Sequence, residues 1–403
     1  MSGGTTRLLL RDTWSATRLR MLGRSSPPVT RPSAGAAALF IGMTNSAGQG
    51  WAWARSVERA ADGIVAVSMM SRRGDPFRFR VDCVVDSVYA ARSRSWQRRQ
   101  LRSLRRFDGV LVESGLGPIG GHVRGNAAEQ VRELLSAGVK VGLVFHGSDV
   151  RDPDWHMSIE PRSHYADDPA YAERFRKVSS RNRRLIEDLD VPVFVSTLGM
   201  LDEVPGANWL PVVVDPSLWE RAEKPFALSR SEPADRPLRV VHVPSDSHIK
   251  GTQLIAETLA ELEERGVIEY RAAVDVPHAE MPVVYGEADV VLDSFRAGGY
   301  GVAACEAMAA GRLVVAHIAP RTRDRVPGHM GEDLPIVEAT VETLGDVLMD
   351  IFLRRDHYSE IAARGPGFVR RNHDGTRSGE ILAGWLLPES PGSNTLHAEE
   401  PLR

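Results

Sequence analysis

The sequence predicts an α/β fold made of two Rossmann-like domains that face each other across a cleft. Short β-type runs alternate with helical patterns along the middle of the chain, which is typical of parallel sheets. The alternation is interrupted once, by the polar segment 216–236, and then restarts, so two sheets are expected. A chain of 403 residues with 42% hydrophobic residues supplies enough apolar material for two cores.

The expected strands are short apolar runs rich in Val, Ile, Leu and Phe, and helical periodicity follows several of them. In the first half, strands are expected at 37–43, 64–68, 81–85, 109–112, 140–145 and 191–195, the last of which closes this half. Helices are expected there at 51–61, 94–106 and 127–137. In the second half, strands are expected at 238–243, 270–274, 288–292 and 313–316, with helices at 252–265, 302–310, 341–353 and in pieces from 358 to 386.

The domain organisation follows from these elements. Residues 1–35 carry six arginines and one acid and are predicted to be a disordered arm, the alternatives being an organelle transit peptide or a start codon assigned too early. The remaining predicted units are an N-terminal domain, a linker, a C-terminal domain, C-terminal helices that pack back on the first domain, and a polar tail, at 36–215, 216–236, 237–355, 356–387 and 388–403.

Composition disfavours a nucleic-acid-binding protein, a disulfide-rich protein and a membrane-spanning protein. The net charge of -3 gives no reason to expect nucleic acid as a partner, and the two cysteines cannot form a disulfide framework. No apolar run approaches the roughly 20 residues of a membrane span. We therefore expect a cytoplasmic protein. Peripheral contact of the basic segment 92–106 with the inner face of the membrane is the less favoured option.

The most informative segment is a glycine-rich loop, GGYG at 298–301, which follows an expected strand and opens directly into a helix containing Glu306. Glycines let a backbone approach a ligand closely, and free N–H groups at a helix start attract an anion such as a diphosphate. A carboxylate about one turn into that helix can accept two hydrogen bonds from the vicinal diol of a ribose. The alternative is that the glycines only make a turn and Glu306 only offsets the helix dipole.

Two further polar segments follow expected strands. VPSDSHIKGT, at 243–252, places Lys250 at a helix start, where it can neutralise a phosphate as a point charge; a solvated lysine is the alternative. FHGSDVR, at 145–151, places His146 and Asp149 at the cleft, and a histidine can donate to a sugar hydroxyl or move protons near neutral pH. The alternative is that Asp149 caps the next turn and His146 packs against it.

Other chemistries are disfavoured. The loop after the first strand, 45–50, has a tryptophan where a dinucleotide fingerprint needs a third small residue, and the G-x-G-x-x-A match at 299–304 has no acidic residue about 20 positions later. A nicotinamide enzyme is therefore disfavoured. The histidines and cysteines show no metal-ligand spacing, so no metal is expected. The acid-rich run 152–168 is predicted to be a mobile, solvated loop.

Taken together, these segments resemble the GT-B-fold glycosyltransferases of the large retaining group known as family 4 or group 1. The best single piece is GGYGVAACEAMAAG, at 298–311, and the resemblance covers roughly residues 36–386. It implies transfer of a sugar, with retention of anomeric configuration, from a nucleotide-diphosphate-sugar donor to a carbohydrate, lipid-linked or small-molecule acceptor. The nucleotide sugar is a substrate, and no cofactor or obligatory metal is expected.

The resemblance also implies residue roles. Glu306 would hold the donor ribose, and Lys250 with Ser245 would hold the diphosphate. The loop backbone would meet the phosphates and the sugar, two glycines of the first loop would let that loop close over the donor, and His146 would lie near the reacting sugar. The implied catalytic residues are His146 and Asp149, and the implied donor-binding residues are Gly48, Gly50, Ser245, Lys250, Gly299, Tyr300, Gly301, Val302 and Glu306.

Two positions depart from the family's pattern. Gly298 stands where the family commonly has a second glutamate, and no arginine lies near Ser247, a few residues before the lysine. Arg296 is a candidate for the replacement positive charge. Two alternatives to a transferase use the same fold: a non-catalytic or weakly active nucleotide-sugar binding protein, and a nucleotide-sugar epimerase.

Overall fold

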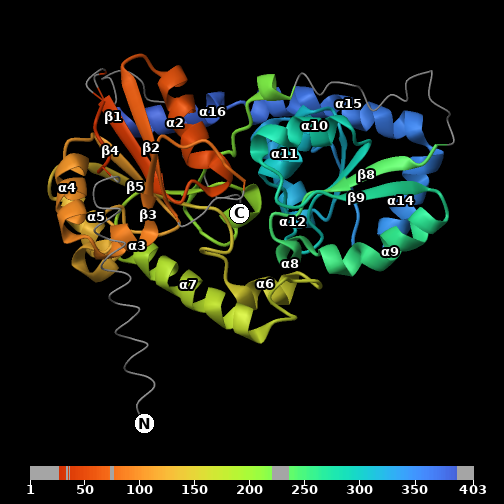
Figure 1. Cartoon of the computed structure of the whole chain (residues 1–403), viewed down its shortest axis with the longest axis horizontal. Helices are drawn as coiled ribbons and strands as arrows, with labels where there is room; N and C mark the ends of the chain where they lie inside the picture. The colour runs from red at the N-terminus through yellow and green to blue at the C-terminus, as the bar shows by residue number, and fades with distance from the viewer. Residues whose placement is uncertain (1–26, 33–34, 36, 73–76, 220–235, 388–403) are drawn as a thin grey trace, which may run out of the picture.

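The computed structural model describes residues 27–32, 35, 37–72, 77–219 and 236–387. Two parallel sheets lie side by side, each covered by helices (Figure 1). The first half of the chain forms a seven-stranded sheet in the order β3-β2-β1-β4-β5-β6-β7, and the second half forms a five-stranded sheet in the order β12-β11-β10-β8-β9. The predicted class, α/β with two Rossmann-like halves, is confirmed.

The strands of the first sheet largely coincide with the expected apolar runs. They are β1 (Ala37–Met43), β2 (Ile64–Arg72), β3 (Cys83–Asp86), β4 (Gly109–Glu113), β5 (Lys140–Phe145), β6 (Val193–Val195) and β7 (Asn208–Trp209). The expectation that the strand at 191–195 closes this half is wrong, because β7 pairs with β6 beyond it. A strand of two residues is too short to carry an alternating pattern, so no periodicity in the sequence marks it.

The helices of the first half include three that were not expected, namely α3, α6 and α7. They are α2 (Gln49–Ala60), α3 (Ser87–Arg92), α4 (Arg94–Leu104), α5 (Ala127–Leu135), α6 (Pro153–Ile159) and α7 (Pro169–Glu187). Helices α6 and α7 each begin with proline after an aspartate, Asp152 or Asp168, whose carboxylate accepts hydrogen bonds from backbone N–H groups of the first turn. Only four residues of α7 are buried, so its apolar face is weak and its periodicity is hard to detect.

The second half follows the predicted alternation with small additions. Its strands are β8 (Leu238–His242), β9 (Ile268–Ala272), β10 (Val290–Leu292), β11 (Leu313–Ala316) and β12 (Ile336–Glu338). Its helices are α8 (Ser247–Lys250), α9 (Thr252–Glu264), α10 (Met281–Gly286), α11 (Val302–Ala309), α12 (Pro320–Arg323), α13 (Arg325–Met330), α14 (Leu344–Leu353), α15 (Arg355–Asn372) and α16 (Thr376–Leu386). The last strand, β12, was not expected, since it has only three residues.

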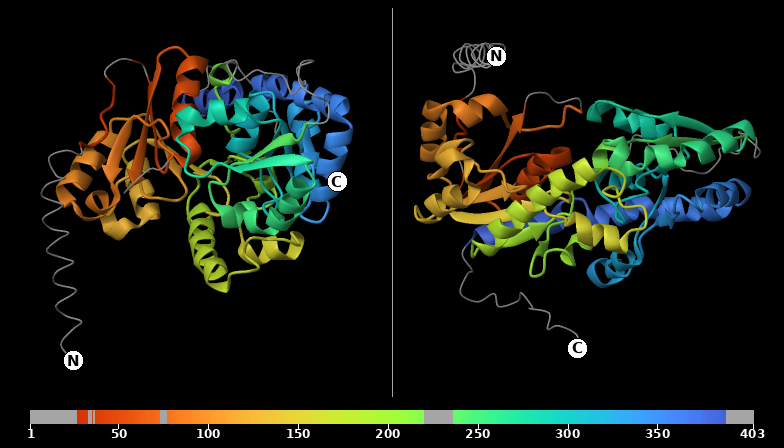
Figure 2. Two further views of the ribbon diagram at one scale, coloured as in Figure 1. Left: turned by 45° about the vertical axis from the view of Figure 1, so that its right-hand side comes forward. Right: turned by 90° about the horizontal axis from the view of Figure 1, so that it is seen from below.

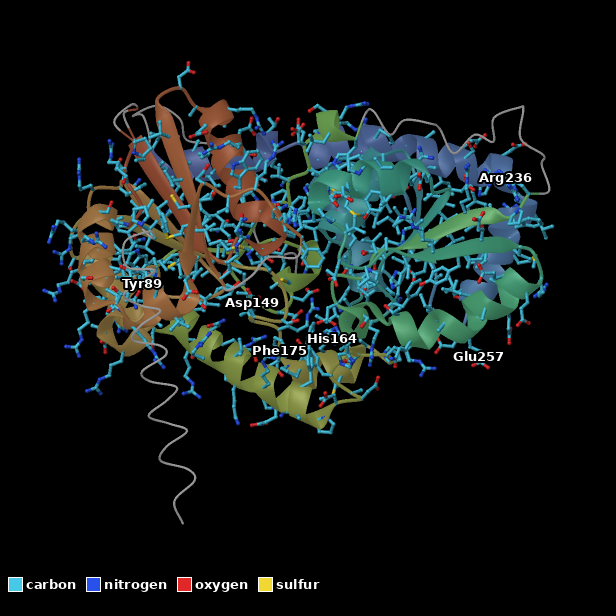
Figure 3. All side chains as sticks on the ribbon, viewed as in Figure 1. Tyr89, Asp149, His164, Phe175, Arg236 and Glu257 are labelled. Carbon is cyan, nitrogen blue, oxygen red and sulfur yellow. The ribbon has the colours of Figure 1, made fainter. Side chains whose placement is uncertain are left out.

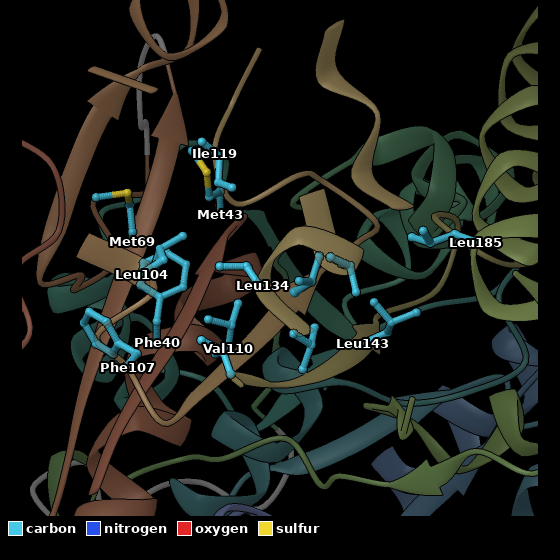
Figure 4. Close-up of a cluster of buried hydrophobic side chains, with 14 of the residues drawn as sticks. Phe40, Met43, Met69, Leu104, Phe107, Val110, Ile119, Leu134, Leu143 and Leu185 are labelled. Carbon is cyan, nitrogen blue, oxygen red and sulfur yellow. The ribbon is translucent and has the colours of Figure 1, made fainter. Parts of the chain in front are cut away.

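The core of the first half corrects the prediction of an arm that is disordered through residue 35. Apolar side chains from the sheet and from α4 and α5 pack together, as in Figure 4, and Val29 is fully buried in the same cluster. The Val29 N–H donates to Gln100 Oε1 over 2.9 Å. Residues 27–32 therefore pack against α4. The burial of Val29 and the hydrogen bond of its N–H stabilise this contact, although the neighbouring residues are polar. Residues 1–26 lie outside the described residues, as does the predicted tail.

The C-terminal helices contact both halves. Helix α15 packs on α11, where Gly365 lies against Met308, and α16 packs on α2, where Gly379 lies against the backbone of Ser56. Leu382 and Leu386 of α16 are buried in one cluster with Trp53 of α2. The chain therefore passes from the first half to the second near residue 215 and returns near residue 373 (Figure 1).

The acid-rich run 152–168 is not a mobile, solvated loop, and that prediction is wrong. In Figures 1 and 2, α6 lies beside the second half, and α7 runs from there back to the first half. His156 and His164 are fully buried, and Figure 3 shows His164 between the two halves. Burial, assisted by the charge of Arg151, lowers the pKa of His156 to about 2 and that of His164 to about 3, so both are neutral at pH 7.

Residues 160–167 bridge the two halves through hydrogen bonds and ion pairs. The guanidinium of Arg296 donates to the carbonyl oxygens of Arg162 (2.8 Å) and Ser163 (2.7 Å), and His248 donates to the carbonyl oxygen of His164 (2.6 Å). Glu160 contacts Arg321 (2.6 Å) and His317 (2.9 Å) of the second half. The run is polar because its side chains and carbonyl oxygens bind charged residues of the second half. The sequence alone does not show which residues those are.

The contacts of His317 predict that this interface weakens at alkaline pH. Hydrogen bonds to Glu160 (2.9 Å) and Glu338 (2.8 Å) raise the pKa of His317 to about 9. The folded pKa exceeds the unfolded value of about 6.5, so the stabilisation is complete below pH 6.5 and is lost as the pH rises through 9. After allowance for solvent screening we expect a loss of about 2 kcal/mol, measured as a falling thermal midpoint between pH 6.5 and 10. His317→Gln should flatten that fall, and parallel pH profiles for the two proteins would contradict the assignment.

Candidate functional site

Two neighbouring cavities lie between the halves, at the carboxyl ends of the strands. The polar cavity, of about 410 Å³, is lined by the turn after β5, by residues of the loops after β8 and β10, and by Gly299, Tyr300 and Gly301. The aromatic cavity, of about 360 Å³, is lined by Trp51, Phe79, Trp219, His278, Val302 and Glu306, among others. Gly301 lines the polar cavity and Val302 the aromatic cavity, so the two cavities lie on either side of the start of α11.

The cavities divide the predicted site residues between them. The polar cavity takes His146, Asp149, Ser245, Lys250, Gly299, Tyr300 and Gly301. The aromatic cavity takes Gly48, Val302 and Glu306. Gly50 is buried and lines neither cavity; a Cβ there would lie 3.2 Å from Asn45 Oδ1 and 3.3 Å from Glu113 Oε2. The structure therefore brings ten of the eleven predicted residues to one composite site.

His146 is held at the mouth of the polar cavity by two neighbours that sequence analysis did not identify. Its ring stacks on Trp53, with centroids 5.6 Å apart and planes at 10°, and its Nε2 lies 3.5 Å from Glu113 Oε1. Burial lowers the pKa of His146, but contact with Glu113 and the charge of Asp149 outweigh it and raise the pKa above its ordinary value. The ring therefore keeps its positive charge to a higher pH than an ordinary imidazole.

Glu113 ends β4 and is fully buried beneath the first loop. Its Oε2 accepts hydrogen bonds from the N–H groups of Thr44 (3.1 Å) and Asn45 (2.8 Å). This carboxylate therefore fixes the loop after β1 and also orients His146. The available signal was a glutamate directly after the apolar run GVLV, where a buried charge needs partners.

Asp149 caps the turn in which His146 lies. Its carboxylate accepts from the N–H groups of His146 (3.0 Å) and Gly147 (2.9 Å). This is the turn-capping alternative that the sequence left open for this residue. Asp149 also lines the polar cavity, between the two halves in Figure 3, so it positions His146 and adds negative charge beside it.

Lys250 lies at the end of α8 and forms an ion pair with Asp293, which is 3% exposed. Its backbone oxygen accepts from the N–H of Phe295 over 3.1 Å, which ties α8 to the loop after β10. The next residue, Gly251, has a φ of 77°, and a Cβ there would lie 2.9 Å from Arg296 Cγ. One carboxylate therefore already engages the lysine that was expected to face a phosphate.

The glycine loop presents backbone to the polar cavity. A Cβ at Gly299 or Gly301 would meet nothing within 4 Å, so a ligand can approach both residues closely. Helix α11 starts after Gly301 without a side-chain cap, which leaves N–H groups of its first turn for another acceptor. The hydroxyl of Tyr300 lies 3.4 Å from His373 Nε2, and the side chain is buried, so Tyr300 offers its backbone to the cavity.

Glu306 lies one turn into α11, at the wall of the aromatic cavity. Its Oε1 accepts a 2.7 Å hydrogen bond from His278 Nε2. Burial lowers the pKa of His278, but Glu306 outweighs burial and raises it. The backbone N–H of His278 donates to the carbonyl oxygen of Phe77 (2.9 Å), and the His278 ring lies 4.9 Å from the ring of Phe79. The first half therefore reaches across the cavity here.

The two departures from the family's pattern have a structural explanation. Gly298 has a φ of 65°, and a Cβ there would overlap Glu160 Oε1, because the bridging segment of the first half fills that space. The suggestion that Arg296 supplies a charge to a phosphate is wrong. Its buried guanidinium holds the bridging segment instead and does not line the polar cavity.

Two general findings concern metals and membranes. Within the part of the chain that the structure describes, no group of three or more His, Cys, Asp or Glu side chains is arranged to hold a metal ion. None of the helices among residues 27–387, outside the gaps given above, combines the length and the apolar character needed to cross a membrane.

Comparison with known proteins identifies the fold. No family model matches the chain. Curated β-hexosaminidases from Pseudomonas aeruginosa are 42% identical over 60 residues, but that match spans only 15% of this chain and 18% of their length. A local match of this extent assigns no activity.

Solved structures match nearly the whole chain. The sucrose-phosphate synthase of Thermosynechococcus elongatus is 12% identical, with a TM-score of 0.57 over 86% of this chain and 97% of that protein. Anabaena HepE in complex with UDP-glucose is 13% identical, with a TM-score of 0.53 over 86% and 99%. An α-glucosyltransferase in complex with UDP and DNA is 9% identical, with a TM-score of 0.52 over 87% and 99%. The chain therefore has the GT-B fold of glycosyltransferases.

Proposed function

We propose that this protein is a glycosyltransferase that moves a sugar from a nucleotide-diphosphate-sugar donor to an acceptor hydroxyl, with retention of anomeric configuration. The observation that carries the proposal is the position of the two cavities at Gly301–Val302, where the uncapped start of α11 lies between an aromatic chamber and a polar one. A nucleotide sugar has the same order of parts: an aromatic base, an anionic diphosphate and a hydroxyl-rich ring.

The donor fits the site in one direction. The nucleoside takes the aromatic cavity, where Trp51, Phe79 and Trp219 offer ring surfaces and Glu306 offers a carboxylate to the ribose diol. The diphosphate lies at the start of α11, with Lys250 and Ser245 beside it. An ammonium has three donors, so Lys250 can keep Asp293 and still donate to a phosphate. The sugar then lies in the polar cavity beside His146.

The reaction in this arrangement is a substitution at the anomeric carbon. The bond from that carbon to the diphosphate oxygen breaks, the acceptor hydroxyl oxygen bonds to the carbon, and the hydroxyl proton leaves with the nucleoside diphosphate. Positive charge at His146 and Lys250 stabilises the negative charge that develops on the leaving diphosphate. Retention is the outcome that the resemblance to family 4 implies, and no metal is assigned to any step.

A second candidate is a nucleotide-sugar binding protein with weak or no transfer activity. The pairing of Lys250 with Asp293 and the absence of a carboxylate at Gly298 favour it, because both change the charge around the sugar and the leaving group. An epimerase is distinguished from both candidates because it converts the donor without any acceptor.

The test is a thermal-shift screen of the full chain with UDP-, GDP- and ADP-glucose and the matching nucleoside diphosphates. We expect one nucleotide series to raise the melting temperature, as mass action requires of a ligand that binds the native state. Nucleotide release that depends on an added acceptor would then identify a transferase, and binding without release would identify the binding protein. A shift with NAD but with none of the nucleotide sugars would overturn both.

A further inference from the structure

The loop after β10 places two buried polar side chains on the wall of the polar cavity. Asp293 and Ser294 are 3% and 2% exposed, and both line that cavity. Their backbones are fixed: the Asp293 N–H donates to Val315 O (3.1 Å), and Ser294 O accepts from the His317 N–H (2.9 Å). The two side chains are therefore presented by a rigid strand end, which is where a specific contact is best built.

Each side chain has a polar atom with unused hydrogen-bonding capacity. Asp293 Oδ1 pairs with Lys250, but Asp293 Oδ2 has no hydrogen-bond partner among the described residues, and Ser294 Oγ has none either. Buried polar atoms without partners are rare because each loses its contact with water without compensation. Such atoms at a cavity wall are explained when a ligand supplies the missing partner.

The opposite wall of the cavity belongs to the first half of the chain and offers the complementary group. His146 Nε2 has only the long 3.5 Å contact with Glu113 Oε1 and no hydrogen-bond partner within the described part of the chain, and the imidazole is a donor when it is protonated. These three groups suit sugar hydroxyls: the Asp293 carboxylate accepts hydrogen bonds, the Ser294 hydroxyl accepts and donates them, and the His146 imidazolium donates them. A ligand carboxylate would instead face the carboxylate of Asp293.

The cations of the polar cavity each face a carboxylate of the protein, and His146 faces Glu113 at 3.5 Å. Lys250 pairs with Asp293, and Arg151 Nε lies 2.9 Å from Glu203 Oε1. Arg151 keeps further N–H donors, but its positive charge is already balanced by Glu203, so a sugar carboxylate would meet no unbalanced guanidinium there.

We propose that Asp293 and Ser294 recognise hydroxyl groups of the transferred sugar, and that this sugar is neutral rather than a uronic acid. Asp293 Oδ2 accepts a hydrogen bond from one sugar hydroxyl, and Ser294 Oγ bonds to the same or an adjacent hydroxyl. The proposal rests on the proposed function and adds to it the class of sugar and the residues that select it.

The experiment measures the affinities of the full chain for three ligands by calorimetry. UDP, GDP and ADP are compared first. The three ligands are then the nucleoside diphosphate that binds, its glucose conjugate and its glucuronate conjugate. The variants are Asp293→Asn and Ser294→Ala. The control is Glu257→Gln, the same loss of charge at an exposed position of α9 that is labelled in Figure 3.

We expect the wild type and the control to bind the glucose conjugate at least ten times more tightly than the glucuronate conjugate. Asp293→Asn should bring that ratio below about three. Ser294→Ala should weaken the glucose conjugate about threefold to tenfold and change affinity for the nucleoside diphosphate by less than twofold.

Three outcomes would overturn the inference while leaving the proposed function in place. The wild type could bind both conjugates equally, Asp293→Asn could leave the ratio unchanged, or Ser294→Ala could bind all three ligands as the wild type does. If Asp293→Asn fails to fold, the wild-type ratio and the serine variant still decide. If no nucleoside diphosphate binds the wild type, the proposed function itself fails, and this inference with it.

Discussion

Replacement of His146 by alanine is expected to lower kcat by about 100- to 10,000-fold while nucleotide affinity stays within about threefold of the wild type. The reason is the place of the ring. It faces the polar cavity, is held by Trp53 and Glu113, and does not line the aromatic cavity. A group placed there acts on the reacting end of the donor rather than on the nucleoside. Steady-state kinetics with the donor found by the screen would measure both quantities.

The pH dependence of kcat distinguishes a role of His146 in the reaction from a merely structural role. The pKa of His146 is raised in the folded protein, so its positive charge persists to a higher pH than usual and is lost as the pH rises through that raised value. Glu113→Gln removes one cause of the rise, so the alkaline fall of kcat should move to lower pH. A profile that does not move, or an equal loss of turnover and nucleotide affinity in His146→Ala, would contradict the role assigned to His146.

Replacement of Glu306 by alanine is expected to weaken nucleotide-sugar binding by about 1.5–3 kcal/mol, or about 10- to 150-fold, because charge-assisted hydrogen bonds contribute on that scale. The ribose diol should be the group that Glu306 recognises. The sharper measurement therefore compares the nucleotide with its 2′-deoxy form. The wild type should discriminate between the two forms, and Glu306→Ala should bind both with the same reduced affinity.

His278 is the matched control for that measurement. It donates to Glu306 Oε1, so His278→Ala frees the carboxylate while leaving it in place, and discrimination against the 2′-deoxy form should survive. Full affinity in Glu306→Ala would refute the placement of the ribose. Lys250→Ala should weaken nucleotide binding on the same scale, but it is a less clean test, because it also leaves Asp293 buried without its partner.

The sequence predicted what depends on local pattern. Apolar runs located most strands, and the rule that ligands bind at the carboxyl ends of parallel strands brought His146, Lys250 and the glycine loop to one place. Glu306 and Lys250 line neighbouring cavities rather than one, since α11 begins between them. The direction of α11 relative to the loop after β8 depends on how the helix packs, so it could not be predicted from the spacing of residues in the sequence.

What the sequence did not predict depends on partners far away along the chain. Glu160 pairs with His317, 157 positions later, and the pair makes a polar segment part of an interface. Asp293 and His278 lacked a motif, and their roles appear only when Lys250 and Glu306 are placed beside them. Gly298 shows the same limit: its lack of a side chain is explained by Glu160, which no local comparison would bring to that position.

The return of the chain from the second half to the first has a mechanical consequence. Where the two crossings pass each other, the Val214 N–H donates to His373 O (2.8 Å), and His373 Nδ1 bonds to Val212 O (2.9 Å). Two chain crossings joined by hydrogen bonds in this way hold the halves together at one place, so we expect any opening of the cleft to pivot there. Such an opening would require the bridging segment 160–167 to part from the second half while the contact of Val214 with His373 stays intact.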